Sequence, residues 1–210
     1  MKMTKKKVFV TALAISLVAI ISMGTLAWFQ ASDTVENIFK VSTDDATQKP
    51  DFKLDLFEHD LLPDGTLGTN EVEKNTYTKI APGDALAKDP TVRNGGQYDQ
   101  WVRISVTLKD YAAWEAILGN GYDFSAVLTG VSTDWSLDSS TVGTDTLVFY
   151  KDSPLTVGST STLFTGVEIP GKEFTVDNMP TEFTLTIVAD AIQSDNTGSS
   201  AQAAFASHWN

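Results

Sequence analysis

The chain contains two histidines, His59 and His208, whose imidazoles could bind zinc or act as a general base near neutral pH. A catalytic zinc site usually takes three protein ligands and an open position, often with two histidines one helical turn apart. These two histidines are far apart in sequence, and no His-Glu-x-x-His motif occurs. A site made of both histidines and a carboxylate is an alternative, but the pattern favours two exposed polar residues and no metal centre.

Serine, threonine and carboxylate side chains are plentiful, but their spacing matches no catalytic motif. There is no Gly-x-Ser-x-Gly elbow, and the absence of cysteine removes any thiol nucleophile, thiolate metal site or disulfide. Asp134, Asp138 and Asp145 in the acidic segment 134–145 could hold calcium, but they lack EF-hand spacing and favour a solvated loop. We therefore predict no catalytic residues, no metal, no cofactor and a protein that is not an enzyme.

The charge of the chain restricts its partners. The formal net charge is −12, and removal of residues 1–27 would take away four lysines and no acidic residue, leaving −16. Nucleic acid and anionic lipid both require basic patches, so neither is an expected partner. Such a charge is typical of a well-solvated protein that stays soluble until a specific contact drives association.

The first 27 residues have the features of a secretory signal peptide. Lys5-Lys6-Lys7 precede an apolar run from Val8 to Leu26, and small residues stand at Thr25 and Ala27. We predict cleavage between Ala27 and Trp28, which leaves residues 28–210 as the mature, secreted protein. The alternative is an uncleaved membrane anchor, because the apolar run approaches the ~18 residues at which a membrane span becomes possible.

Most of the remaining sequence alternates between apolar and polar residues with a period of two, which indicates half-buried strands. Turn signals such as Pro82-Gly83-Asp84, Asn94-Gly95 and Pro170-Gly171 separate these segments, and Asn94-Gly95 tolerates positive φ. The pattern predicts an all-β fold, a jelly-roll-like β-sandwich with short helices covering the sheets. The strands are expected at residues 52–56, 102–108, 146–150, 162–169 and 183–189, with Arg103 on the solvated face.

Two segments have helical spacing instead. Tyr111 to Leu118 is bounded by Asp110 as a possible N-cap and by Gly119 as a stop, and Ala201 to Trp209 follows a polar linker. Both helices are expected to cover sheet edges or ends. The expected organisation is a signal peptide (1–27), an N-terminal strand (28–41), a β-sandwich domain (42–193), and a linker with a short C-terminal helix (194–210).

Motifs near the N-terminus and in the centre of the chain carry a resemblance to a known family. Gly24-Thr25-Leu26-Ala27 is followed by Trp28-Phe29 and, after a polar run, by Asn37-Ile38-Phe39. The centre of the chain has Pro82-Gly83-Asp84, a segment ending at Asn94-Gly95, and Trp101-Val102-Arg103. In these motifs the chain resembles the TasA/camelysin family of Gram-positive biofilm-matrix proteins, which are exported through a dedicated signal peptidase.

The resemblance implies a secreted structural protein that forms extracellular matrix fibres. In such fibres the mature N-terminal strand completes the sheet of the next subunit, although the same segment could pair within its own domain as an ordinary first strand. The partners would be further copies of the chain or related matrix proteins. The residues expected to form the polymerisation strand are Trp28, Phe29, Val35, Ile38, Phe39 and Val41.

Two alternatives to a fibre subunit stay open. One is a monomeric cell-surface adhesin or accessory matrix protein, which would share the signal peptide and the fold. The other is a camelysin-like metalloprotease, which the scarcity of histidine disfavours. In each case the protein would be extracellular, and it would contact the membrane only through an uncleaved signal peptide.

Overall fold

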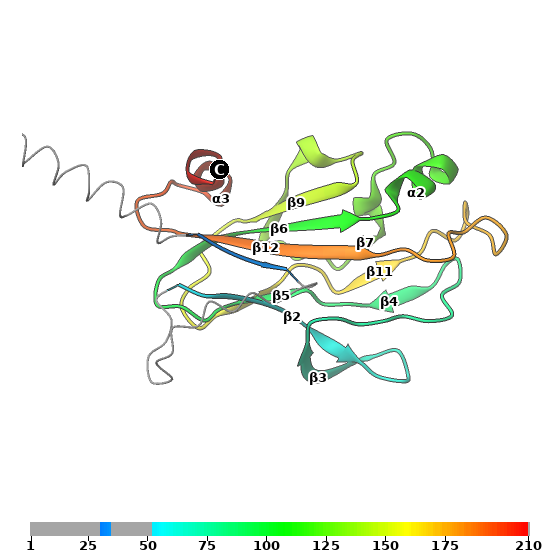
Figure 1. The fold of residues 1–210 in the computed structure, drawn as a ribbon, viewed down its shortest axis with the longest axis horizontal. Coiled ribbons are helices and arrows are strands. Elements are labelled where there is room, and N and C mark those ends of the chain that lie inside the picture. Colours follow the sequence, from blue (N-terminus) through cyan, green and yellow to red (C-terminus); the bar gives the residue numbers. More distant parts are fainter. Residues whose placement is uncertain (1–29, 35–51, 210) are drawn as a thin grey trace, which may run out of the picture.

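The computed structural model describes residues 30–34 and 52–209 (Figure 1). It is mostly antiparallel β-sheet with two α-helices, so the prediction of an all-β fold is confirmed for this part of the chain. The strands are β1 (Gln30–Thr34), β2 (Leu54–Leu61), β3 (Leu67–Val72), β4 (Ala85–Ala87), β5 (Thr91–Asn94), β6 (Gln100–Leu108), β7 (Leu128–Thr129), β8 (Trp135–Leu137), β9 (Thr146–Lys151), β10 (Thr160–Thr162), β11 (Gly166–Glu168) and β12 (Leu185–Gln193). Short 3-10 turns, η1 (Phe124–Val127) and η2 (Ser139–Thr141), interrupt the loops.

One layer of the fold is a five-stranded sheet in the order β1-β12-β6-β9-β8. Its centre is the long pair β12 and β6, which runs from Leu185 opposite Leu108 to Gln193 opposite Gln100. The N-terminal strand β1 lies at one edge and, among the described strands, pairs only with β12. Figure 1 shows β1, in blue, beside the orange β12.

The second layer contains a four-stranded sheet, β10-β5-β2-β3, and a three-stranded sheet, β4-β11-β7. The two are joined by a continuous ladder, because Thr162 opposite Thr91 and Gly166 opposite Ala87 have the same offset. Between these pairs, the Leu163 N–H donates to the Pro90 carbonyl over 2.9 Å. The segment 162–169, expected as one strand, is therefore two short strands, β10 and β11, in one register.

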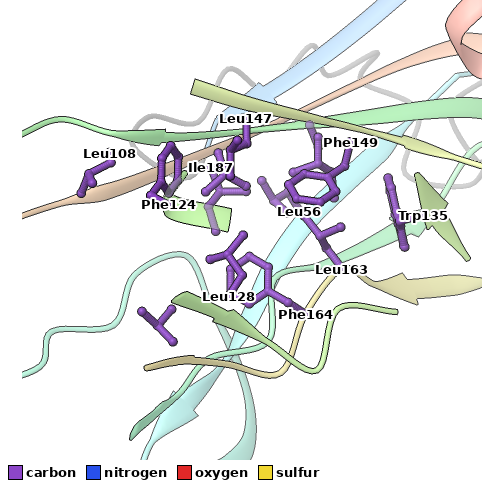
Figure 2. Close-up of a cluster of buried hydrophobic side chains, with 14 of the residues drawn as sticks. Leu56, Leu108, Phe124, Leu128, Trp135, Leu147, Phe149, Leu163, Phe164 and Ile187 are labelled. Carbon is purple, nitrogen blue, oxygen red and sulfur yellow. The ribbon is translucent and has the colours of Figure 1, made fainter. Parts of the chain in front are cut away.

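The core fills the space between the two layers (Figure 2). Alternate residues of the central strands point inward, and Val102, Ile104 and Val106 of β6 are fully buried. Burial of each such aliphatic side chain contributes roughly 1.5–3 kcal/mol, so this packing can hold a cysteine-free chain together. The buried residues labelled in Figure 2 are Leu56, Leu108, Phe124, Leu128, Trp135, Leu147, Phe149, Leu163, Phe164 and Ile187.

The first helix, α2 (Tyr111–Leu118), has the predicted bounds. Its Trp114 is buried and packs edge-on against Phe174 and Phe183, with ring centroids 5.0 Å and 5.2 Å away. Gly119 ends the helix with a φ of 108°, a conformation that favours glycine. Asp110 stands at the N-cap position, but its side chain makes no capping hydrogen bond.

The second helix, α3 (Ala201–His208), packs on the outer face of the five-stranded sheet against β6 and β9. Its Phe205 lies 4.6 Å from the guanidinium of Arg103, which in turn donates to Asp190 from Nε over 2.9 Å. The expectation that Arg103 lies on a solvated face was wrong, because α3 covers it. Among the described residues, neither helix is long and apolar enough to cross a membrane.

Two local expectations were also wrong. The segment 134–145 is not only a loop, because it contains β8 and η2, and Trp135 is buried. Neither Asn94 nor Gly95 has a positive φ. Instead the buried Asn94 amide donates to the carbonyls of Tyr98 and Leu155, both over 2.8 Å, and so joins two loops.

Candidate functional site: the open edge of strand β12

Strand β12 has one edge that is only partly covered by described residues. Along its other edge, β6 pairs with all of residues 185–193. On this edge, β1 pairs with residues 188–192, from Gln30 opposite Ile192 to Thr34 opposite Val188. No described strand pairs with residues 185–187 on this side, so their edge is open to an additional strand among the parts of the chain that the structure describes.

A cleft of about 440 Å³ lies beside this open edge. One wall is formed by residues 182–187, and the other by the segment 74–88 and β11. The wall side chains are largely apolar, and the mouth carries one charge of each sign, Lys74 and Glu182. The apolar lining residues are Ile80, Leu86, Val167, Phe183, Leu185 and Ile187.

The floor of the cleft is polar and built around Glu58. Glu58 faces inward from β2 because it continues the alternation of the buried Leu54 and Leu56, and its side chain is 1% exposed. It forms an ion pair with Lys88, whose side chain is 12% exposed. A buried carboxylate requires such a partner, because desolvation of an unpaired charge is costly.

On the edge that faces β5, the last residues of β2 are bonded by side chains instead of by a strand. β2 continues beyond its last pairing with β5, which joins Phe57 to Thr91. Beyond that point, the His59 N–H donates to Asp89 Oδ1 and the Leu61 N–H donates to Asn75 Oδ1, both over 2.9 Å. These side chains satisfy backbone groups that would otherwise lack partners.

Tyr77 spans the cleft wall and donates its hydroxyl to the Ala87 carbonyl over 2.6 Å. Burial, reinforced by the negative charges of Glu58 and Asp89, raises the pKa of Tyr77 well above its usual value of 10.0. The phenol therefore remains a neutral donor at physiological pH. On β12, the Thr186 hydroxyl is buried and has no hydrogen-bond partner among the described residues.

The combination of an open strand edge and an apolar cleft suits an extended polypeptide. The backbone of residues 185–187 can supply ladder hydrogen bonds, and the cleft can receive alternate apolar side chains from the added strand. Such a mode gives affinity through the main chain and specificity through the side-chain positions. We therefore take residues 183–187 and the cleft as the candidate site.

The sequence-predicted site residues lie on either side of β1. The structure describes Gln30–Thr34 as a strand, paired within its own domain. The predicted cleavage and polymerisation residues, Ala27, Trp28, Phe29, Val35, Ile38, Phe39 and Val41, lie outside the described residues.

The two histidines are not brought together in the fold. His59 lies on β2 and its Nδ1 is 2.5 Å from Asp89 Oδ2, whereas His208 ends α3 on the other layer. Within residues 30–34 and 52–209, no three His, Asp or Glu side chains form a group that could hold a metal ion. The expectation that His59 is simply an exposed residue was wrong, because it is held by Asp89.

The acidic segment 134–145 uses its carboxylates locally. Asp138 accepts the backbone N–H of Ser140 over 3.0 Å and thereby caps η2. Asp134 lies 3.7 Å from the buried Lys151 ammonium. Both carboxylates thus have structural partners within the segment or in the adjacent strand.

Sequence analysis did not identify the polar floor. A signal was present, because the alternation that makes Leu54 and Leu56 inward-facing also points Glu58 into the core. Its partners Asn75 and Lys88 lie in irregular segments without a periodic pattern. Their position depends on the tertiary fold.

No protein-family model, curated protein or solved structure matches this chain.

Proposed function

We propose that this protein is a secreted structural component of the extracellular biofilm matrix, with a jelly-roll-like β-sandwich that assembles into fibres by donating its N-terminal strand to a neighbouring subunit. The observation that supports this proposal most strongly is the open edge of β12 beside an apolar cleft, at the point where β1 ends. The partners are copies of the same chain or related matrix proteins. A dedicated signal peptidase releases the chain from the membrane by cutting after Ala27.

The register of β1 supports the choice of donated segment. Each described pair of β1 and β12 keeps one offset, which ends at Thr34 opposite Val188. The same offset, continued, would place Val35, Asn37 and Phe39 opposite Ile187, Leu185 and Phe183. Those three β12-side residues line the cleft. The apolar face of the N-terminal segment would thus meet the apolar wall of the site.

Within one chain, β1 pairs with the edge of its own β12, so fibre formation requires this strand to be exchanged for that of a neighbouring subunit. β1 is an edge strand, and among the described strands it pairs only with β12, so a neighbour's N-terminal strand can take its place with identical hydrogen bonds. Because a donated strand makes a head-to-tail contact, repeated donation produces a filament unless the rotation closes a ring.

A second function, a monomeric adhesin or accessory matrix protein, is favoured by one specific observation. The described part of the N-terminal segment already pairs within its own domain, which leaves a complete five-stranded sheet without a neighbour. In this role the open edge of β12 would receive a strand from another matrix protein. The two functions differ in whether the purified chain polymerises alone.

Negative-stain electron microscopy of residues 28–210 at increasing concentration distinguishes these functions. Fibre subunits would form filaments, and the same chain carrying Phe39→Asp would remain monomeric because a carboxylate cannot enter the apolar cleft without a partner. Normal filaments from the Phe39→Asp chain would contradict donation of this strand. Persistent monomers of the unaltered chain would support the accessory role.

A further inference from the structure

One carboxylate in the cleft floor joins a lysine to an asparagine. Glu58 binds the Lys88 ammonium through Oε1, and its Oε2 accepts a hydrogen bond from Asn75 Nδ2 over 3.2 Å. The amine of Lys88 is a nucleophile when deprotonated, and the side-chain amide of Asn75 is an acyl group. The shared carboxylate thus holds an acyl acceptor and an acyl donor on its two oxygens.

The Asn75 amide is fixed on every polar atom. Its Oδ1 accepts the Leu61 N–H over 2.9 Å, and its Nδ2 donates to the His59 carbonyl over 2.8 Å as well as to Glu58. A backbone N–H on the carbonyl oxygen withdraws electrons from Cγ and would stabilise the negative charge of a tetrahedral intermediate. The amide is therefore oriented and polarised for attack.

The surroundings favour an intramolecular reaction over hydrolysis. The side chains of Glu58 and Lys88 are 1% and 12% exposed, and both belong to the same cleft as Asn75. Fixing both reactants on one carboxylate supplies the proximity that makes an otherwise slow amide exchange possible. The cleft also offers the leaving group a path to solvent.

The geometry points to an autocatalytic isopeptide bond between the side chains of Lys88 and Asn75, with Glu58 as the proton carrier. The Lys88 Nζ–Asn75 Cγ bond forms and the Asn75 Cγ–Nδ2 bond breaks. Glu58 accepts the two protons that Nζ sheds and passes both to the departing nitrogen, which leaves as ammonium. The step conserves charge and requires no cofactor or co-reactant.

The cross-link would tie the segment after β3 to the junction of β4 and β5. Both segments line the cleft, and the first of them, between β3 and β4, pairs with no described strand. A covalent bond would give this cysteine-free chain the kind of constraint that a disulfide gives other extracellular proteins. The inference does not depend on fibre formation, because it concerns bonds within one chain.

Intact-mass spectrometry of the purified, denatured full chain tests the bond directly. The expected mass is about 17 Da below the sequence mass, because one ammonia is lost. Trypsin should release residues 75–79 joined to residues 80–93, with no cleavage after Lys88. A full sequence mass, with residues 75–79 recovered as a separate peptide and with cleavage after Lys88, after prolonged incubation of the folded protein, would overturn the proposal.

Matched variants exclude other routes to the same mass. Lys88→Arg keeps a cation beside Glu58 but should abolish the mass loss, and Glu58→Gln should abolish it as well. Lys74→Arg, at the cleft mouth, should retain the mass loss. A succinimide at Asn94-Gly95 would also lose ammonia, but it hydrolyses in mild base and would persist in Lys88→Arg. Persistence of the loss in that variant would contradict the cross-link, and the wild-type peptides decide the question even if Glu58→Gln fails to fold.

Discussion

Thr34 lies directly opposite Val188, and beyond this pair no described strand pairs with this edge of β12. The next residues of β12 form the wall of the cleft, so the end of one strand and the start of the candidate site coincide. This relationship links the N-terminal segment to a particular acceptor surface in the proposed assembly. It also makes the proposal testable on the acceptor side, where every residue is described.

A charge on the acceptor wall should prevent assembly. Leu185→Asp places a carboxylate in the cleft, where it opposes the apolar face of an incoming strand. We expect no filaments from this variant by electron microscopy, and a circular dichroism spectrum like that of the unaltered chain. Val176→Asp is the matched control, because Val176 is 85% exposed and lies outside the cleft lining. Equal filament formation by the two variants would contradict the proposed acceptor site.

The attachment of α3 depends strongly on one side chain. Phe205 is 2% exposed and packs against Tyr150, Trp209 and the Arg103 guanidinium. Phe205→Ala should lower the free energy of unfolding by about 3 kcal/mol, measured by urea denaturation, since it leaves a cavity and removes a cation–π contact. The exposed Gln202→Ala on the same helix should change it by less than about 0.5 kcal/mol. A small effect of Phe205→Ala would mean that α3 adds little to stability.

Two turns that are remote in sequence pack against each other, and this contact should tolerate no side chain. A Cβ at Gly171 would lie 2.9 Å from the Gly83 Cα, which is closer than real Cβ contacts. Gly171→Ala should therefore cost about 1–3 kcal/mol in thermal or urea unfolding, because backbone must shift. Gly95→Ala is the control, since its Cβ would meet the flexible side chain of Lys53 at 3.1 Å. A larger loss for Gly95→Ala would refute this account of the contact.

The ion pair between Glu71 of β3 and Arg93 of β5 should lose its stabilising contribution in acid. The Arg93 guanidinium bonded to Glu71 lowers the pKa of that carboxyl below its usual value of 4.5. Because the folded-state pKa is the lower one, the stabilising contribution is present above about pH 4.5 and disappears as the pH falls through the folded value. NMR titration of Glu71 should give a midpoint below 4.5 that rises in Arg93→Gln. An unchanged midpoint in that variant would show that the pair is not formed in solution.

The sequence predicted elements best where local pattern and tertiary packing agree. Trp114 and Ile117 have helical spacing, and the helix was found with the expected bounds. The segment 134–145 was misjudged because three residues of β8 are too few to show a period, and Trp135 is buried by residues remote in sequence, including Ser161, which accepts its indole N–H. Arg103 was misplaced because the cover over it comes from α3, about a hundred residues later in the chain.

The candidate site was less accessible to sequence reasoning than the fold. The N-terminal motif indicated which segment could be donated, but the acceptor arises where Phe183 and Leu185 meet the irregular segment around Tyr77. Of these residues, only Glu58 could be predicted from the sequence, because the alternation of β2 places its carboxylate on the inward face. Its two partners lie in different segments, Asn75 between β3 and β4 and Lys88 between β4 and β5, and no local pattern in either segment indicates a contact with Glu58.

Cysteine trapping tests strand donation most directly, because the natural chain has no cysteine. Ala31 and Ala191 are register partners in β1 and β12, so cysteines at both positions are close enough to form a disulfide. In assembled protein, the account predicts a ladder of covalently linked subunits on a non-reducing denaturing gel, and linkage within single chains in dilute monomer. Assemblies that contain only internally linked chains would contradict donation of the N-terminal strand.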